Sequence, residues 1–172
     1  MKTKPDLLPI PEGLWIATMK ETQSRILILL DSSERLLRSG GDTALCAGLY
    51  TYAVEEYGKL MVLKQYKPVS GRVVIKYKNE FRNHMYKFPE ATKNLLPECL
   101  LLRQGIFDPV IFDPAIFDTQ SVTADFESRM AIFYTDFDDS GIKLQSIPSI
   151  DNSLLERAII KLREIVLMVT IP

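Results

Sequence analysis

The uninterrupted run from Asp42 to Tyr66, DTALCAGLYTYAVEEYGKLMVLKQY, constrains the fold of this chain more than any other stretch. Aspartate is a favoured residue just before a helix, and no proline follows Asp42 until Pro68. On a helical wheel the run is apolar on almost every side. A helix of this kind is typically buried in the middle of a helical domain, so we predict a central helix here.

The polar residues of this helix need an explanation, because an unpaired charge in a protein interior is costly. Glu56 falls in the middle of the strongest apolar stripe, with Lys59 beside it. That stripe consists of Leu45, Leu49, Tyr52, Leu60 and Leu63. We therefore expect Glu56 to be buried and paired. Glu55 stands four residues before Lys59, a spacing typical of a surface ion pair on a helix.

Length and composition indicate one domain, residues 1–172, with an ordinary balance of 47% hydrophobic and 25% charged residues. A net charge of -1 gives no bulk attraction to nucleic acid or anionic membrane. Cys46 and Cys99 are expected to be buried free thiols. No signal peptide and no apolar run long enough to span a membrane is recognised, so a cytoplasmic protein with no membrane partner is expected.

The remaining pattern predicts an all-α bundle of four to five helices. Residues 1–19 are expected to form an extended, proline-rich arm that Trp15 packs onto the helices. A helix up to Ser39 forms an antiparallel hairpin with the central helix, across Gly40 and Gly41. Further helices are expected over 73–88, over 90–103 and from Ser153, where a capping box begins, to about Val169.

A long loop with an unusual repeat precedes the last helix. The tripeptide Ile-Phe-Asp starts at Ile106, Ile111 and Ile116, and a spacing of five fits neither a helix nor a strand. The segment is either a loop pinned by its phenylalanines or a recognition surface for a partner. The phenylalanines concerned are Phe107, Phe112 and Phe117.

One set of polar residues could carry chemistry, since phosphate-binding loops, zinc-ligand pairs and nucleophile elbows are absent. The only histidine, His84, follows Tyr77 and Phe81 at helical spacing. Glu56 and His84 could meet in the interior, where a carboxylate orients an imidazole for acid–base work or satisfies a structural histidine. The candidate catalytic residues are His84, Glu56, Lys87 and Arg82; no metal or cofactor is expected.

These residues give the sequence a resemblance to AbiV-type abortive infection proteins, a branch of the HEPN helical superfamily. The helix from Ala47 to Lys59 resembles that family's A…EE-x-GK element. The segment from Phe81 to Lys87 is similar to its F-x-x-H-x-x-K element. Residues Arg129 to Asp136, followed by Pro148 and an amphipathic helix, resemble its R…YxD…P ending.

The resemblance implies a HEPN-like bundle, often a homodimer, that blocks phage growth at the level of translation or RNA. Many HEPN proteins are metal-independent RNases with an arginine a few residues before the histidine. Here residues 77–79 are Tyr, Lys and Asn, so that motif is not intact. The implied binding residues are Glu55, Lys59, Lys78, Arg129 and Tyr134.

Two functional hypotheses follow, and the sequence leaves the enzymatic status open. In the first, the chain is a phage-defence protein, and in its enzymatic form His84 acts as acid–base on RNA. In the second, it is a non-catalytic helical module with a buried structural polar cluster. Its partner would then be a phage or host protein rather than RNA.

Overall fold

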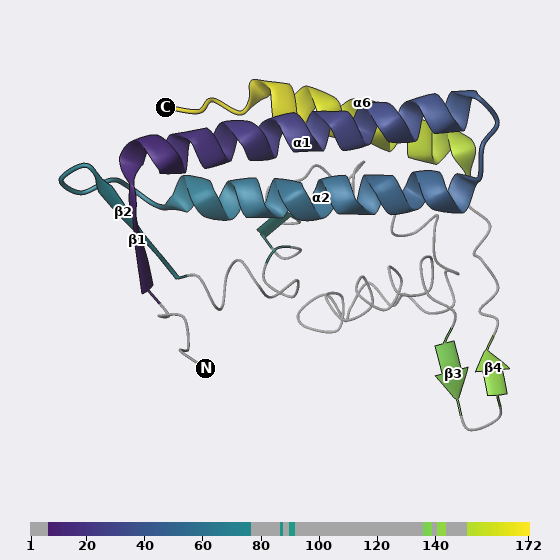
Figure 1. Ribbon diagram of the computed structural model, residues 1–172. Coiled ribbons are helices and arrows are strands. Elements are labelled where there is room, and N and C mark those ends of the chain that lie inside the picture. The colour runs from purple at the N-terminus through teal and green to yellow at the C-terminus, as the bar shows by residue number, and fades with distance from the viewer. Residues whose placement is uncertain (1–6, 77–86, 88–89, 92–135, 139–140, 144–150) are drawn as a thin grey trace, which may run out of the picture.

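The computed structural model of the chain describes residues 7–76, 87, 90–91, 136–138, 141–143 and 151–172. Three long helices dominate this part: α1 (Glu12–Arg38), α2 (Thr43–Gln65) and α6 (Asn152–Met168). Figure 1 shows α1 and α2 side by side, with α6 running along them. The predicted mainly helical class is therefore confirmed. Of the expected helix over 90–103 the structure describes only residues 90–91, which are helical, and the Ile-Phe-Asp loop lies outside the described residues.

The hairpin of α1 and α2 agrees with the sequence in its details. Asp42 is the N-cap of α2, and its Oδ1 accepts hydrogen bonds from the backbone N–H of Ala44 and Leu45. The turn between the helices uses Gly40 at a φ of +71°, a conformation that glycine adopts without strain. At the far end, the Trp15 indole Nε1 donates to the Leu63 carbonyl at 2.9 Å. This contact ties the start of α1 to the end of α2.

Helix α6 completes the core with a stripe of apolar side chains that are almost fully buried. The stripe consists of Leu155, Ala158, Ile159, Leu162 and Val166. The α6 N-cap is Asp151, whose Oδ1 accepts from the N–H groups of Ser153 and Leu154. The sequence predicted Ser153 as the first residue of this helix cap, but the N-cap lies two residues earlier, at Asp151. The Asp151 carboxylate already accepts from the first free N–H groups of the helix.

A two-stranded antiparallel sheet corrects two expectations. Residues 1–19 were expected to be an extended arm, but within the described residues 7–19 the extended part, β1 (Leu7–Pro11), ends where α1 begins at Glu12. Residues 73–88 were expected to form a helix, but β2 (Arg72–Lys76) is a strand paired with β1. Val73 and Ile75 face the core while Val74 is exposed, so the burial alternates with the period of a strand. Pairing with β1, which is far away in sequence, makes residues 72–76 a strand, whereas residues 77–86 lie outside the described part of the chain.

Proline positions in β1 fit this pairing. Pro9 lies opposite Val74, and Pro11 lies opposite Arg72. The backbone N–H and C=O of Arg72 both bond to Val69, on the side away from β1. Since the ladder alternates, Pro9 and Pro11 occupy positions where no N–H is required by the partner strand. A second sheet pairs β3 (Asp136–Asp138) with β4 (Gly141–Lys143).

Candidate functional site

The clearest polar feature of the interior is an ion pair between α2 and Lys87. The Lys87 Nζ lies 3.0 Å from Glu55 Oε1, and the two side chains are only 9% and 6% exposed. A buried carboxylate and ammonium of this kind tolerate the loss of water because each neutralises the other. In this arrangement the ammonium of Lys87 faces the protein interior. It therefore holds its own segment in place rather than presenting a charge to solvent.

Gly58, one turn after Glu55, brings the backbone of Lys87 against the same helix. A Cβ placed on Gly58 would lie 1.8 Å from the Lys87 carbonyl oxygen. No side chain fits in that space, so only glycine permits the approach. Lys87 therefore contacts α2 at two places: its side chain pairs with Glu55, and its backbone packs against Gly58.

Glu90 and Ala91, the next described residues after Lys87, lie near the C-terminal end of α2 and in the core. Glu90 Oε2 accepts a hydrogen bond of 2.5 Å from Gln65 Nε2. Ala91 is fully buried in the core. Lys87 near Gly58 and Glu90 near Gln65 therefore fix both the direction and the register of this short segment.

The buried carboxylate is Glu55, not Glu56 as we expected. Glu56 is half-buried, and its Oε2 lies 3.3 Å from the Nζ of Lys59 on the same helix. Leu45, in the stripe that was expected to be the most deeply buried, is 46% exposed. The opposite side of α2 is packed into the core, with Cys46, Ala53 and Tyr57 at most 3% exposed. Near the C-terminal end of α2 the predicted stripe is buried as well, with Leu60 and Leu63 at most 1% exposed. Adjacent residues point about 100° apart on a helix, which moves Glu55 inward and Glu56 outward.

Other sequence-predicted site residues lie outside the described part of the chain. These are His84, Arg82 and Lys78, the binding candidates Arg129 and Tyr134, and the partner-loop residues Phe107, Phe112 and Phe117. Of the candidates, the structure places Glu55, Glu56, Lys59 and Lys87. It brings Glu55 together with Lys87 and leaves Glu56 with Lys59.

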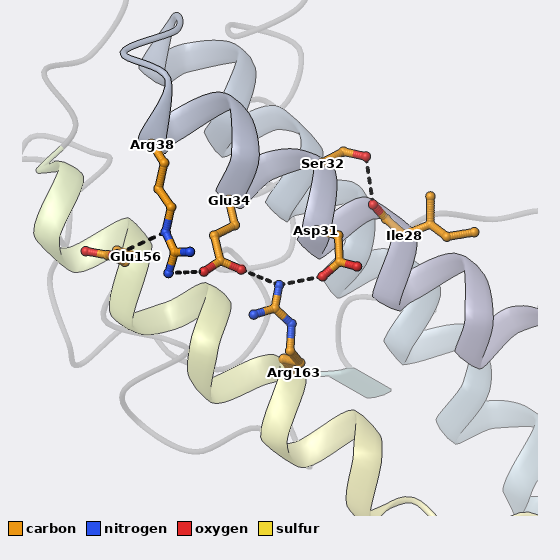
Figure 2. A network of polar contacts seen from close by, with 7 residues as sticks. All are labelled: Ile28, Asp31, Ser32, Glu34, Arg38, Glu156 and Arg163. Carbon is orange, nitrogen blue, oxygen red and sulfur yellow. Dashed lines mark hydrogen bonds and ion pairs between the residues drawn. The ribbon is translucent and has the colours of Figure 1, made fainter.

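A charge network between α1 and α6 was not predicted (Figure 2). Arg163 on α6 reaches Asp31 at 2.7 Å and Glu34 at 2.6 Å. Glu34 also pairs with Arg38, which lies 3.9 Å from Glu156. Charges of this kind on two helices show no joint pattern in sequence, since their meeting depends on how the helices cross. The network fixes the position of α6 along α1 and contains no group positioned for chemistry.

The shifted acidities of Cys46 and Asp151 do not suggest a reactive site. Burial raises the pKa of the Cys46 thiol, and the nearby Asp42 carboxylate adds to this. A thiol with a raised pKa is a poor nucleophile. Hydrogen bonds from Ser153 and Leu154 lower the pKa of Asp151, as expected for a capping carboxylate. No cluster of three or more metal-ligating side chains occurs among the residues whose structure is described.

Comparisons with known proteins do not connect this chain to a family. No family model matches it, and neither the curated proteins nor the solved structures give a significant match. Within the described residues, no helix is long and apolar enough to cross a membrane.

Proposed function

We propose that this chain is a phage-defence protein of the abortive-infection type that blocks phage growth at the level of translation or RNA. One observation carries the proposal. Lys87, the last residue of one motif that resembles the family, contacts Glu55 and Gly58 of the other motif. Residues from two separate motifs that form one buried contact are more specific support than either motif alone.

In the enzymatic form of this proposal, the buried pair positions the catalytic segment. Lys87 follows His84 by three residues in the sequence. His84 would take the proton from an RNA 2′-hydroxyl as that oxygen attacks the adjacent phosphate and the bond between phosphorus and the 5′-oxygen breaks; the 5′-oxygen would take a proton from water. Arg82 or Lys78 would stabilise the developing negative charge. Lys87 is removed from the catalytic set, because its ammonium is buried against Glu55.

The second candidate is the non-catalytic interaction module, and the depth of the same ion pair favours it. With both side chains at least nine-tenths buried, Glu55 and Lys87 fix a helical scaffold and offer nothing to a dissolved substrate. Function would then lie on the surface, with a phage or host protein as the partner. A homodimer is compatible with either form.

The deciding experiment compares the wild-type chain with His84→Ala in three measurements: phage plaque formation in an expressing host, cleavage of a fixed RNA by purified protein, and thermal unfolding. Lys20→Ala is the control, because Lys20 is an exposed cation on α1 and belongs to none of the candidate sites. The sequence holds one histidine, so the imidazole NMR signal reports the titration of His84 without ambiguity.

Three outcomes separate the possibilities. Loss of protection and of cleavage in His84→Ala, with an unchanged melting curve, supports the RNase form. Protection that survives His84→Ala, without RNA cleavage by either protein, supports the interaction module. Wild-type protein that does not reduce plaque formation rejects the phage-defence proposal.

A further inference from the structure

One end of the molecule carries an apolar surface that the fold does not cover. The β1–β2 sheet turns Leu8, Ile10, Val73 and Ile75 inward, and residues on its other side are exposed. Leu7 is 55% exposed, Val74 is 50% exposed, and Val69 in the adjoining turn is 74% exposed. In Figure 1 this sheet lies at the end of the α1–α2 pair opposite the turn that joins them.

Two exposed basic residues border this surface. Lys67 and Arg72 are exposed and form no ion pair in the described part of the chain. Between Lys64 and Lys76 the sequence has four basic residues and no acidic one. These basic residues lie close together in sequence, whereas the net charge of the whole chain is -1. We call the surface formed by Leu7, Lys67, Val69, Arg72 and Val74 the hairpin face.

The chemistry of the hairpin face selects one class of partner. Proteins that bind single-stranded RNA add aromatic side chains on which bases stack, and the hairpin face has none. Tyr66, the aromatic residue nearest in sequence, is half-buried and its hydroxyl accepts from the N–H of Lys76. Membrane-surface anchors are rich in Trp, Phe and Leu, whereas two of the three aliphatic side chains here are valines. Aliphatic side chains bordered by cations instead match a polypeptide that has apolar residues next to carboxylates.

We propose that the hairpin face binds an extended polypeptide segment in which apolar and acidic side chains lie close together. The apolar side chains of the partner cover Val69, Val74 and Leu7, and its carboxylates pair with Lys67 and Arg72. The surface is small, so the contact is of the weak, transient type. This inference does not depend on the proposed phage-defence activity, because the hairpin face shares no residue with the candidate site.

The test uses a peptide of defined sequence as the probe. Residues 105–120, GIFDPVIFDPAIFDTQ, combine phenylalanine, isoleucine and aspartate without any cation. A fluorescein-labelled peptide of this sequence is titrated with the full-length chain and followed by fluorescence anisotropy. We expect a Kd on the order of 100 µM, the weak end expected for a small interface. A second peptide, with all three aspartates changed to asparagine, reports the contribution of charge.

Variants locate the binding surface. Arg72→Glu is expected to weaken binding at least about tenfold, since it replaces attraction by repulsion. Val69→Ser is expected to weaken it about fivefold through lost apolar burial. Arg25→Glu is the matched control, because Arg25 is an exposed arginine on α1 and the change in net charge is the same. It should leave the Kd unchanged.

Four results would overturn the inference. These are no binding of the acidic peptide at about 1 mM protein, equal binding of the asparagine peptide, equal loss in Arg72→Glu and Arg25→Glu, or tighter binding to single-stranded RNA or phosphatidylserine vesicles. Melting curves of each variant are required, and only variants that melt as the wild type does are compared. Phage protection by the same variants is measured separately, so failure of either proposal is visible by itself.

Discussion

The buried pair of Glu55 and Lys87 makes a quantitative prediction about stability. Lys87→Met removes the ammonium and keeps an unbranched side chain of similar length, so the Glu55 carboxylate loses its cation at a site where the side chain is 6% exposed. Removing one member of a buried pair costs about 3–5 kcal/mol. For a chain of 172 residues this corresponds to a fall in Tm of roughly 10 °C.

Urea unfolding followed by circular dichroism measures this free energy, and Lys59→Met is the matched control. Lys59 also pairs with a glutamate of α2, but its side chain is 25% exposed and the pair spans one helical turn. A half-exposed pair of this kind contributes about 0.5 kcal/mol or less. Losses of equal size in the two variants, or a loss below about 1 kcal/mol in Lys87→Met, would refute the burial argument.

Three further substitutions test the local geometry. Gly58→Ala should lower the free energy of unfolding in urea by about 3 kcal/mol or more, because the added Cβ would overlap the Lys87 carbonyl. Gly13→Ala is the control and should be neutral or stabilising, because a Cβ at Gly13 would have no atom within 4 Å. Equal effects of the two substitutions would contradict the close approach at Gly58. Ser70→Gly should stabilise by about 0.5–1 kcal/mol, since Ser70 has a φ of +50° that a side chain disfavours; a loss of stability would show that the serine has another role. Asp151→Ala should destabilise at neutral pH. The pKa of Asp151 is lower in the folded state than its ordinary value of 3.8. The stability that the Asp151 carboxylate contributes is therefore present above pH 3.8 and is lost as the pH falls through the folded-state pKa. A stability difference from wild type that persists at lower pH would contradict the capping role.

The sequence predicted the helices best where local signals and packing agree. Asp42 as a cap, an uninterrupted run to Gln65 and a glycine-containing turn before it all favour the same α2. The sequence failed at Val73, because a strand of five residues is set by its distant partner, β1. The spacing of Tyr77, Phe81 and His84 favoured a helix, and extending that helix back to Val73 was the error.

The candidate site was predicted in its composition but not in its geometry. Glu55, Glu56, Lys59 and Lys87 were all identified from sequence, yet the assignment of the buried carboxylate was wrong by one position. A helical wheel shows which residues share a side, but α2 is apolar on both sides and the wheel cannot tell which one faces the core. Gly58 was the residue in the sequence that could have shown which side of α2 is closely packed at Glu55. A glycine in the middle of a helix is unfavourable, so its presence indicates a close contact, and Glu55 lies one turn from it on that same side.

Together, Glu55 and Gly58 indicate why a buried ion pair occupies a place where two apolar residues would pack. Replacing a buried pair by apolar side chains is often neutral or stabilising, so stability alone does not explain its presence. A charge that must meet its partner allows only one register of residues 87–91 along α2, whereas apolar side chains accept several. We therefore expect Glu55→Leu combined with Lys87→Met to regain most of the stability lost in Lys87→Met alone, while the amide NMR signal of Gly58 becomes broadened or doubled. A single sharp Gly58 signal in the double variant would show that Gly58 alone sets the register.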